Sequence, residues 1–248
     1  GKVSGVVTEK GAIACQAVVC AAGAWSSFFS GNLGHAFPQL KVKASVLRTK
    51  PAPLISQTSI GSPGASLRRR QDGGYTIARS GSSYFQITPD AFRYFREFLP
   101  ALQTSMKPRL RIGAEFFKEL MRPRSWSGDD VTEFEKTRVL DPVPDPGTLR
   151  EVLAAAQENF PQLGSLEIAE TWAGMIEVTP DAIPVWSGVD DLEGYYIATG
   201  FSGHGFGMGA ATGLIMSELV TGGKSRFDLE PFRLSRFTDG SKLELNAR

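Results

Sequence analysis

Short runs of apolar and β-branched residues predict strands at the beginning of the chain. Residues 3–8 and 12–19 form two such runs, and the turn sequence Glu9-Lys10-Gly11 between them predicts a hairpin. The second run is continuously apolar, which is typical of a strand covered on both faces in a parallel sheet. Ser26 follows this run, and we expect it to cap a short helix.

The middle of the chain predicts antiparallel strands. Residues 41–50 are strand-like, and a loop rich in Pro, Gly and Ser extends from there to residue 65. Residues 66–70 and 75–78 flank Asp72-Gly73, a pair that readily adopts the positive φ angles of a tight hairpin turn. This region therefore predicts an antiparallel sheet.

Three segments of the middle region have apolar residues at helical spacing. The first begins at Thr88-Pro89-Asp90, the second spans residues 113–121, and the third begins at Thr148, which we expect to be its cap. We interpret the first two as core or interface helices rather than cofactor-binding segments. Their apolar positions are Phe92, Phe95, Leu99, Phe116, Phe117 and Leu120.

Short strand-like runs return after residue 167, at 168–172 and 195–199, and a last helix is expected over 207–220. The two ends of the chain therefore share a pattern that the middle lacks. We predict an α/β domain made from residues 1–40 and 166–248, with an inserted antiparallel α+β domain at residues 41–165.

Composition limits the classes of function. The chain has 248 residues, of which 42% are hydrophobic and 21% charged, and this excludes a disordered or fibrous protein. The formal net charge of +1 gives no long-range field for nucleic acid or an anionic membrane, so we expect neither as a partner. No signal peptide precedes the first strands, and no apolar run reaches the ~20 residues of a membrane span, so we expect a cytoplasmic enzyme.

The two cysteines, Cys15 and Cys20, stand in an apolar strand-like stretch. We expect both to be buried thiols, because their spacing fits neither a metal site nor a disulfide framework.

A glycine-rich loop at residues 200–207 joins the strand at 195–199 to the last helix. Gly205, Gly207 and Ala210 match the G-x-G-x-x-G/A fingerprint of dinucleotide sites, but no acidic residue follows at the end of a second strand, so a pyrophosphate site is not favoured. The same helix start can direct its partial positive charge at a ring that becomes anionic, such as reduced flavin.

Three segments carry a family resemblance. Residues 21–26 (Ala-Ala-Gly-Ala-Trp-Ser), 170–181 (Glu-Thr-Trp-Ala-Gly-Met-Ile-Glu-Val-Thr-Pro-Asp) and 198–207 (Ala-Thr-Gly-Phe-Ser-Gly-His-Gly-Phe-Gly) resemble, in this order, the D-amino-acid oxidase/dehydrogenase superfamily, which includes glycine and sarcosine oxidases and related deaminases. The resemblance implies a partial FAD-binding Rossmann-like domain with an inserted antiparallel-sheet substrate domain. It also implies a noncovalent FAD that oxidises the carbon–nitrogen bond of an amino acid or secondary amine. Hydride would pass from the substrate Cα to flavin N5, and the imine product would be hydrolysed by water.

The resemblance also implies site residues. His204 is the catalytic candidate, either as a donor near the flavin C2 carbonyl or as a group that tunes the proton of the substrate amine. The cofactor-binding positions are Ala22, Gly23, Trp25, Trp172, Gly174, Asp181, Gly200, Phe201, Ser202, Gly203, His204, Gly205, Phe206 and Gly207.

The sequence departs from the family pattern at the substrate-binding position. Some members carry an arginine just after Trp-Ala-Gly that pairs with the substrate carboxylate, whereas this chain has Met175, Ile176 and Glu177 there. We expect the carboxylate partner to be one of three arginines of the inserted sheet. The candidates are Arg48, Arg69 and Arg79, and Glu177 is the candidate for the substrate amino group.

A second departure is that the family pattern begins with a βαβ unit carrying G-x-G-x-x-G, and this sequence starts beyond it. We therefore expect a missing N-terminal half, a second subunit that supplies the adenine site, or a loss of FAD binding, and we favour the first. Two alternatives stay open: a nicotinamide-dependent dehydrogenase that uses residues 205–210, and a non-catalytic subunit or fragment that works with a separate FAD-binding chain. The substrate, its handedness, the electron acceptor and the oligomeric state are not determined by the sequence.

Overall fold

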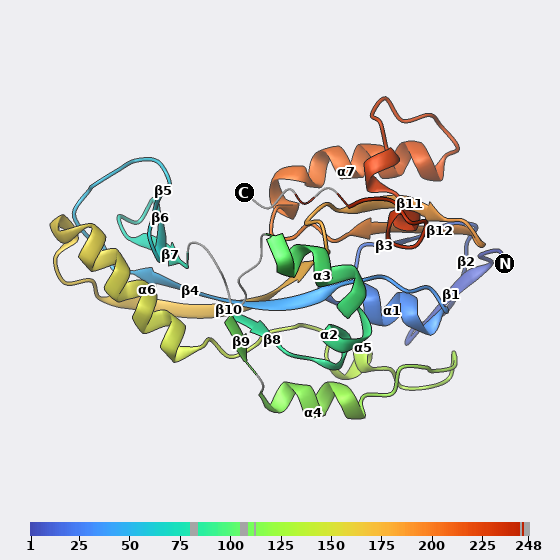
Figure 1. The fold of residues 1–248 in the computed structure, drawn as a ribbon, viewed down its shortest axis with the longest axis horizontal. Coiled ribbons are helices and arrows are strands. Elements are labelled where there is room, and N and C mark those ends of the chain that lie inside the picture. The colour runs from blue at the N-terminus through green and yellow to red at the C-terminus, as the bar shows by residue number, and fades with distance from the viewer. Residues whose placement is uncertain (80–83, 105–108, 112, 244, 246–248) are drawn as a thin grey trace.

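Three sheets organise the chain (Figure 1). The computed structural model describes residues 1–79, 84–104, 109–111, 113–243 and 245. The smallest sheet is a hairpin of β1 (Gly5–Thr8) and β2 (Gly11–Ala14), whose turn uses Gly11 at a φ of 113°. The predicted hairpin is confirmed, because its turn lies at Glu9-Lys10-Gly11.

The apolar run at residues 12–19 is divided between two sheets. Its first part forms β2, and its second part leaves the hairpin as β3 (Val18–Cys20) and pairs with β12 (Leu192–Thr199). The prediction of one strand covered on both faces is wrong, since Val19 is 40% exposed. The parallel pairing of β3 with β12 causes the division, because it takes Cys20 to a position opposite Ile197.

The three-stranded sheet has the order β11 (Val185–Val189), β12, β3. β12 runs antiparallel to β11 and parallel to β3, so the carboxyl ends of β12 and β3 lie at the same edge of this sheet. The 3-10 turn η1 (Gly23–Trp25) and helix α1 (Ser26–Asn32) follow β3. The predicted helix is present, but Ser26 does not cap it. Its N-cap is Trp25, and the Ser26 hydroxyl donates instead to Thr199 Oγ1 over 3.1 Å.

The largest sheet is built on a long antiparallel pair, β4 (Leu40–Thr49) and β10 (Ile168–Val178), which crosses the centre of the molecule in Figure 1. The other edge of β4 pairs with β7 and, further along, with β8. The predicted Asp72-Gly73 turn between β6 and β7 is confirmed, with Gly73 at a φ of 84°. The remaining strands of this sheet are β5 (Ile60–Ser62), β6 (Ala65–Arg69), β7 (Tyr75–Ala78), β8 (Tyr84–Gln86) and β9 (Arg109–Arg111).

Helix α6 (Pro146–Asn159) covers one face of this sheet. Its buried Leu149, Val152 and Ala156 form a core with side chains of β4, β6 and β7, as their helical spacing predicts. The predicted cap at Thr148 is wrong. Asp145 is the N-cap, and its Oδ1 accepts the backbone N–H of Thr148 over 2.7 Å, because Pro146 occupies the first helical position and has no N–H to be capped.

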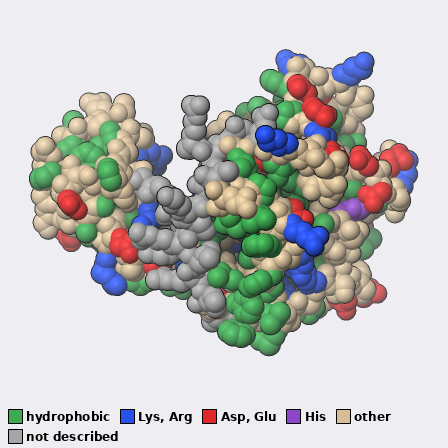
Figure 2. All heavy atoms as spheres, in the orientation of Figure 1, with side chains coloured by type: hydrophobic (Ala, Val, Ile, Leu, Met, Phe, Trp, Pro, Cys, Tyr) green, Lys and Arg blue, Asp and Glu red, His purple; other side chains and the backbone are tan. Residues whose placement is uncertain are grey.

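Among the described residues between β8 and α6 there are four shorter helices: α2 (Pro89–Arg93), α3 (Phe95–Thr104), α4 (Ala114–Met121) and α5 (Glu133–Lys136). The first two occupy one predicted helix that is interrupted at Tyr94. Of the two roles expected for these helices, core or interface, Phe92, Phe117 and Leu120 do not fill the first, since these side chains are 60% exposed or more, and an interface role stays a prediction. Figure 2 shows hydrophobic side chains gathered at the lower edge of the molecule, over α4.

Helix α7 (Gly205–Val220) lies on β11 and β12 and begins two residues before the predicted start (Figure 1). Gly222, at a φ of 72°, follows its end. Thr212, Ile215 and Met216 are buried against the sheet, whereas the opposite side of the helix is open to solvent. Within the described part of the chain, no helix combines the length and the apolar character that crossing a bilayer requires.

Two 3-10 turns follow α7, η3 (Glu230–Phe232) and η4 (Leu234–Phe237), and both contact β11. Another, η2 (Pro161–Leu163), ends α6 and brings Leu163 into the core beneath that helix.

Candidate functional site

The glycine-rich loop lies at the carboxyl edge of the parallel pair β3–β12. Gly200 turns the chain out of β12 with a φ of 81°, and an added Cβ there would stand 2.6 Å from Thr179 Cγ2. Ser202 has a φ of 52°, which is rare outside glycine, and its hydroxyl bonds to the Gly200 carbonyl and the Thr179 N–H. The loop is thus held tightly against the turn that follows β10.

The segment after β3 meets the glycine loop at this edge. Gly23 has a φ of 52°, and its carbonyl accepts the side-chain amide of Gln39 over 2.8 Å. Gln39 also accepts the Ser27 N–H, and the bond between Ser26 and Thr199 joins this segment to the end of β12. Sequence reasoning missed Gln39, because a single polar residue before a strand carries no local signal of such a bracing role.

β10 supplies a third side of the site. Gly203 comes within contact distance of Ile176, since an added Cβ would stand 3.8 Å from Ile176 Cγ2. Trp172, Gly174 and Ile176 point to the same face of the strand because side chains alternate. Gly174 has open space above it and Trp172 is 37% exposed, so an open surface extends from the loop along β10.

A cavity of about 770 Å³ opens beside the start of α7. The turn at residues 182–184 forms one wall, Gly203, His204 and residues 206–208 form another, and Pro231 and Phe232 complete the lining. Among the described residues, the N-cap His204 gives α7 no side-chain cap, so the first-turn amides are free to donate to a ligand. An added Cβ at Gly207 would meet no atom within 4 Å, so the backbone at Gly207 borders this open space with no side chain between them.

These features fit the pyrimidine end of a flavin ring. The cavity walls carry apolar side chains and backbone groups, and the uncapped helix start offers donors to a ring that collects negative charge. Of the predicted cofactor-binding residues, Gly203, His204, Phe206 and Gly207 line this cavity, whereas a role for Ala22 and Gly23 stays a prediction.

His204 and Phe206 are both exposed at the cavity. The His204 Nδ1 lies 3.3 Å from the carbonyl oxygen of Phe201, and the Phe206 side chain is fully exposed. His204 can therefore present Nε2 to a ligand while Nδ1 faces the backbone. Its role in catalysis stays a prediction.

Asp181 lies behind the cavity wall rather than in it. Its side chain is 1% exposed, and its carboxylate forms a two-point ion pair with Arg236, with Nε to Oδ2 at 2.7 Å and Nη2 to Oδ1 at 3.1 Å. Both oxygens are occupied, so Asp181 would act on a cofactor through the turn that it holds. Sequence reasoning missed Arg236, which follows Asp181 by 55 residues and belongs to no recognisable motif.

Trp25 is packed in an aromatic cluster with Phe28, Phe29, Trp126 and Phe134. The side chains of Lys41 and Arg122 lie over its ring, with 5.6 and 5.3 Å to the centroid. These contacts place Trp25 beneath the segment at 22–23 as a support.

The three candidate arginines lie on different faces of the large sheet. Arg48 shares a face with Trp172, because Glu170 and Trp172 stand opposite Arg48 and Val46, and its Nε lies 2.7 Å from Glu170 Oε2. Arg69 and Arg79 are on the α6 side. Arg69 donates to the Ala52 carbonyl, and Arg79 pairs with Glu151 of α6 at 2.5 Å.

Glu177 is adjacent to Ile176 in sequence and therefore points to the other face of β10. Its Oε2 lies 3.9 Å from the Cβ position of Gly23, and its backbone stands opposite Lys41. The Glu177 side chain thus approaches the predicted cofactor-binding segment at residues 22–23. A role toward a substrate amine stays a prediction.

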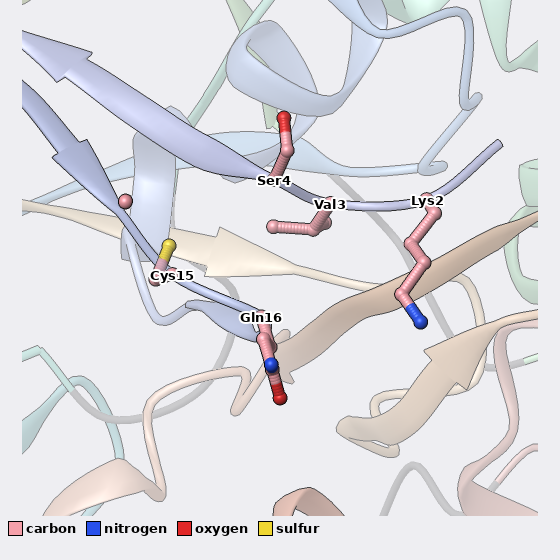
Figure 3. A pocket seen from close by; sticks show the side chains of 6 residues that line it. Lys2, Val3, Ser4, Cys15 and Gln16 are labelled. Carbon is pink, nitrogen blue, oxygen red and sulfur yellow. The ribbon is translucent and has the colours of Figure 1, made fainter.

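A second cavity of about 520 Å³ lies at the base of the β1–β2 hairpin (Figure 3). It is near the amino end of β12, since Lys2 pairs with Glu193, and thus at the edge of the sheet opposite to the glycine loop. Cys15 lines it and is half-buried, which corrects the expectation that both cysteines are buried. The lining residues are Lys2, Val3, Ser4, Ala14, Cys15 and Gln16.

Comparison with known proteins bears on this site. A family model described as DAO, FAD dependent oxidoreductase, matches residues 1–219. The L-amino acid deaminase of Proteus myxofaciens, solved in complex with anthranilate, is 32% identical with a TM-score of 0.88, and the match covers 96% of this chain and 53% of that one. The glycine oxidase of Geobacillus kaustophilus is 24% identical over 230 residues, covering 92% of this chain and 47% of the relative.

A D-amino acid dehydrogenase of Paramagnetospirillum magneticum is 35% identical over 98 residues, which is 40% of this chain and 23% of that protein. The chain spans about half the length of the relatives that it matches over most of its residues.

Proposed function

Because this chain belongs to the DAO family of FAD-dependent oxidoreductases, we propose that it contributes the flavin-ring and substrate sides of an enzyme that oxidises the carbon–nitrogen bond of an α-amino acid. The observation that carries the proposal is the uncapped start of α7, which faces a cavity at the carboxyl edge of the parallel strands β3 and β12. Bound FAD would supply the two-electron acceptor.

Residues of this chain would then bind and orient the flavin and the substrate. The first-turn amides of α7 stabilise negative charge at the flavin N1 and C2 carbonyl, because they are fixed dipoles that need no reorganisation. The loop at 200–207 allows the ring to approach the backbone, and His204 adds a donor at the cavity mouth.

The open surface over Gly174 and Trp172 is the proposed substrate side. Arg48 shares this face and is the candidate for the substrate carboxylate, once it exchanges Glu170 for the ligand. Solved relatives of more than 25% identity include two L-amino acid deaminases and an L-proline dehydrogenase, which favours α-amino acids, proline included, as the first substrates to test.

The adenine part of FAD needs a further unit. α7 is apolar on all sides, yet Leu214 and the small residues of its outer side are exposed, and a helix of this kind is normally covered. β3 also has an unpaired edge among the described strands. We propose that a βαβ nucleotide-binding unit, on the same or a second polypeptide, covers both.

The test is an absorbance spectrum of the purified protein with and without added FAD, both alone and together with the polypeptide that carries the nucleotide-binding unit. Anaerobic addition of D- and L-amino acids, N-methyl amines and a matching α-hydroxy acid as the control follows. We expect flavin bands that bleach with one class of amino acid and are unaffected by the hydroxy acid. A protein that binds NADH and no flavin contradicts the proposal and supports a nicotinamide enzyme. A colourless protein that ignores FAD supports a non-catalytic subunit.

A further inference from the structure

The buried ion pair between Arg236 and Asp181 is the strongest unexplained feature near the cavity. Arg236 is 5% exposed and Asp181 2%, although charged residues are rarely buried unless they are paired. Besides the two bonds to Asp181, Arg236 donates to the Ile183 carbonyl over 2.8 Å and to the Arg233 carbonyl over 2.9 Å. Its guanidinium also lies over the Phe237 ring, 4.1 Å from the centroid.

Arg236 thereby fixes a turn in an unfavourable conformation. Ala182 stands between the two residues that Arg236 contacts and has a φ of 57°, which costs free energy for a residue with a Cβ. Asp181 Oδ1 also accepts the Ile183 N–H over 3.1 Å. The carboxylate therefore binds the N–H of Ile183, while the guanidinium of Arg236 binds its carbonyl.

The same turn forms a wall of the cavity. Ala182, Ile183 and Pro184 line it directly, as does the start of α7. On its other side the turn bonds to the glycine loop, because the Thr179 N–H donates to the Ser202 hydroxyl and Thr179 Oγ1 donates to the Ile183 carbonyl. A movement of this turn therefore changes both walls.

We infer that Arg236 is a positioning residue of the flavin-ring cavity, acting through the Asp181 turn, and that it keeps the negative charge of Asp181 neutralised beside the place where reduced flavin collects charge. This inference rests on the proposed function. Its charge part follows from Coulomb's law, since an uncompensated carboxylate behind the wall repels an anionic ring in a medium of low dielectric constant. Its geometric part follows from the two-point bond, which only arginine can form.

The experiment measures the flavin midpoint potential and FAD retention of the flavin-loaded protein with four variants. Arg236→Gln leaves Asp181 unpaired, so we expect a lower midpoint potential and faster loss of FAD. In the double variant Asp181→Asn/Arg236→Gln both charges are absent, and we expect the potential to return to that of the unsubstituted protein. Arg236→Lys keeps the charge without the two-point bond, so the potential should be unchanged while FAD is lost faster.

The matched control is Arg233→Gln, a neighbouring arginine whose side chain pairs with Glu230 and Asp239 and, among the described residues, bonds to none of residues 181–184. The substitution keeps the Arg233 backbone carbonyl that Arg236 uses. We expect it to change neither the potential nor the retention of FAD. The double and lysine variants keep the test decisive if Arg236→Gln alone does not fold. Equal potentials in Arg236→Gln and Arg233→Gln, or no recovery in the double variant, would overturn the inference while leaving the proposed function intact. An unsubstituted protein that retains no flavin even with the nucleotide-binding unit present would overturn both.

Discussion

Glycine serves two different purposes in the loop at 200–207. Gly200 is required by the backbone, because its φ is positive and an added Cβ would meet Thr179 Cγ2 at 2.6 Å. Gly207 lies in helical backbone with open space where a side chain would stand. Gly200 is therefore needed for folding, whereas Gly207 is proposed to leave room for a ligand.

Substitution by alanine at these positions should have opposite effects on stability. We expect Gly200→Ala to lower the free energy of unfolding by at least about 1 kcal/mol. Gly207→Ala should preserve or raise it, by up to about 1 kcal/mol, since alanine favours a helix. In the flavin-loaded protein, Gly207→Ala should nevertheless weaken FAD binding because its methyl group enters the cavity. Urea denaturation and FAD titration check this, and normal FAD affinity in Gly207→Ala would contradict the proposed ring position.

Tyr195 gives a prediction of pH dependence. Burial raises the pKa of its phenol well above the ordinary value of 10, and the neighbouring Cys20 adds to this direction. A raised pKa in the folded state means that its stabilising contribution is complete below pH 10 and is lost as the pH rises further. Tyr195→Phe should cost about 1 kcal/mol near pH 8, through the bond to Ser30, and should make the alkaline loss of stability shallower. Urea unfolding between pH 8 and 11 measures both, and an unchanged slope would contradict the assignment.

At the residue scale, sequence predicted what depends on local backbone. The glycines of the loop and the Asp72-Gly73 turn were identifiable because their residue types report a positive φ. The partnership of Arg236 with Asp181 was not predictable, since it depends on the path of the chain after α7. The structure likewise shows that Arg48, among the three candidate arginines, shares the face of Trp172.

At the scale of elements, α4 is attached to the molecule by its polar side. Glu119 lies 2.8 Å from Lys41 of β4, with both side chains mostly buried, and Arg122 lies 3.7 Å from the same carboxylate. Phe117 and Leu120 point outward. The helix is thus held by an ion pair beside Trp25 together with the contact of Phe116 with Phe92 of α2.

Neutralising Glu119 should release α4 locally. We expect Glu119→Gln to lower the free energy of local opening by roughly 1–3 kcal/mol, because a partly buried charged hydrogen bond is lost. Amide exchange over residues 114–121 should rise accordingly, without a comparable change elsewhere. Glu115→Gln is the control, since its pair with Lys118 is exposed and contributes little. Equal exchange in the two variants would show that other contacts hold α4.

Helical spacing predicted where these elements lie better than which way they face. The stripe on α6 is buried as predicted, whereas most of the predicted apolar positions on α2, α3 and α4 are exposed, because spacing shows only that a stripe exists. The caps were misplaced for a related reason. Asp145 and Thr148 can both cap α6, and Pro146 at the first helical position makes Asp145 the cap. Ser26 can cap α1, but its hydroxyl bonds to Thr199 instead.

At the scale of the whole molecule, the cores are separate. One contains Leu47, Val152 and other residues between 47 and 166, and the others are made by residues before 40 and after 184, such as Val185. The long β4–β10 pair connects the two regions (Figure 1). The division into domains at 1–40 with 166–248 and at 41–165 stays a prediction that this separation makes testable.

If the division is real, each core should respond to its own substitution. Val152→Ala and Val185→Ala each remove a fully buried side chain and should cost roughly 2 kcal/mol. We expect the first to lower protection of β6 and β7 in hydrogen exchange under mild urea, and the second to lower protection of β11 and β12. A single transition that both variants shift equally would show one cooperative unit instead.

The arrangement of the whole molecule was predictable through the order of the three resembling segments rather than through pattern alone. The parallel pairing of β3 with β12 depends on a partner more than 160 residues away in sequence, and the same pairing divides residues 12–19 between two sheets. Strand β11 pairs with β12 through a hairpin whose turn contains no glycine. Local periodicity carries no information about such partners.

The chain between the glycine loop and Arg236 contains two sites that proteases can reach. Lys224 and Arg226 are exposed in the segment that joins α7 to η3, so trypsin-like enzymes can cut there. A sample cut there would retain every residue of the glycine loop, but Arg236 would then be held to Asp181 by noncovalent contacts alone. Preparations that lose their yellow colour on storage should therefore be checked by intact mass before any loss of cofactor is ascribed to the active site.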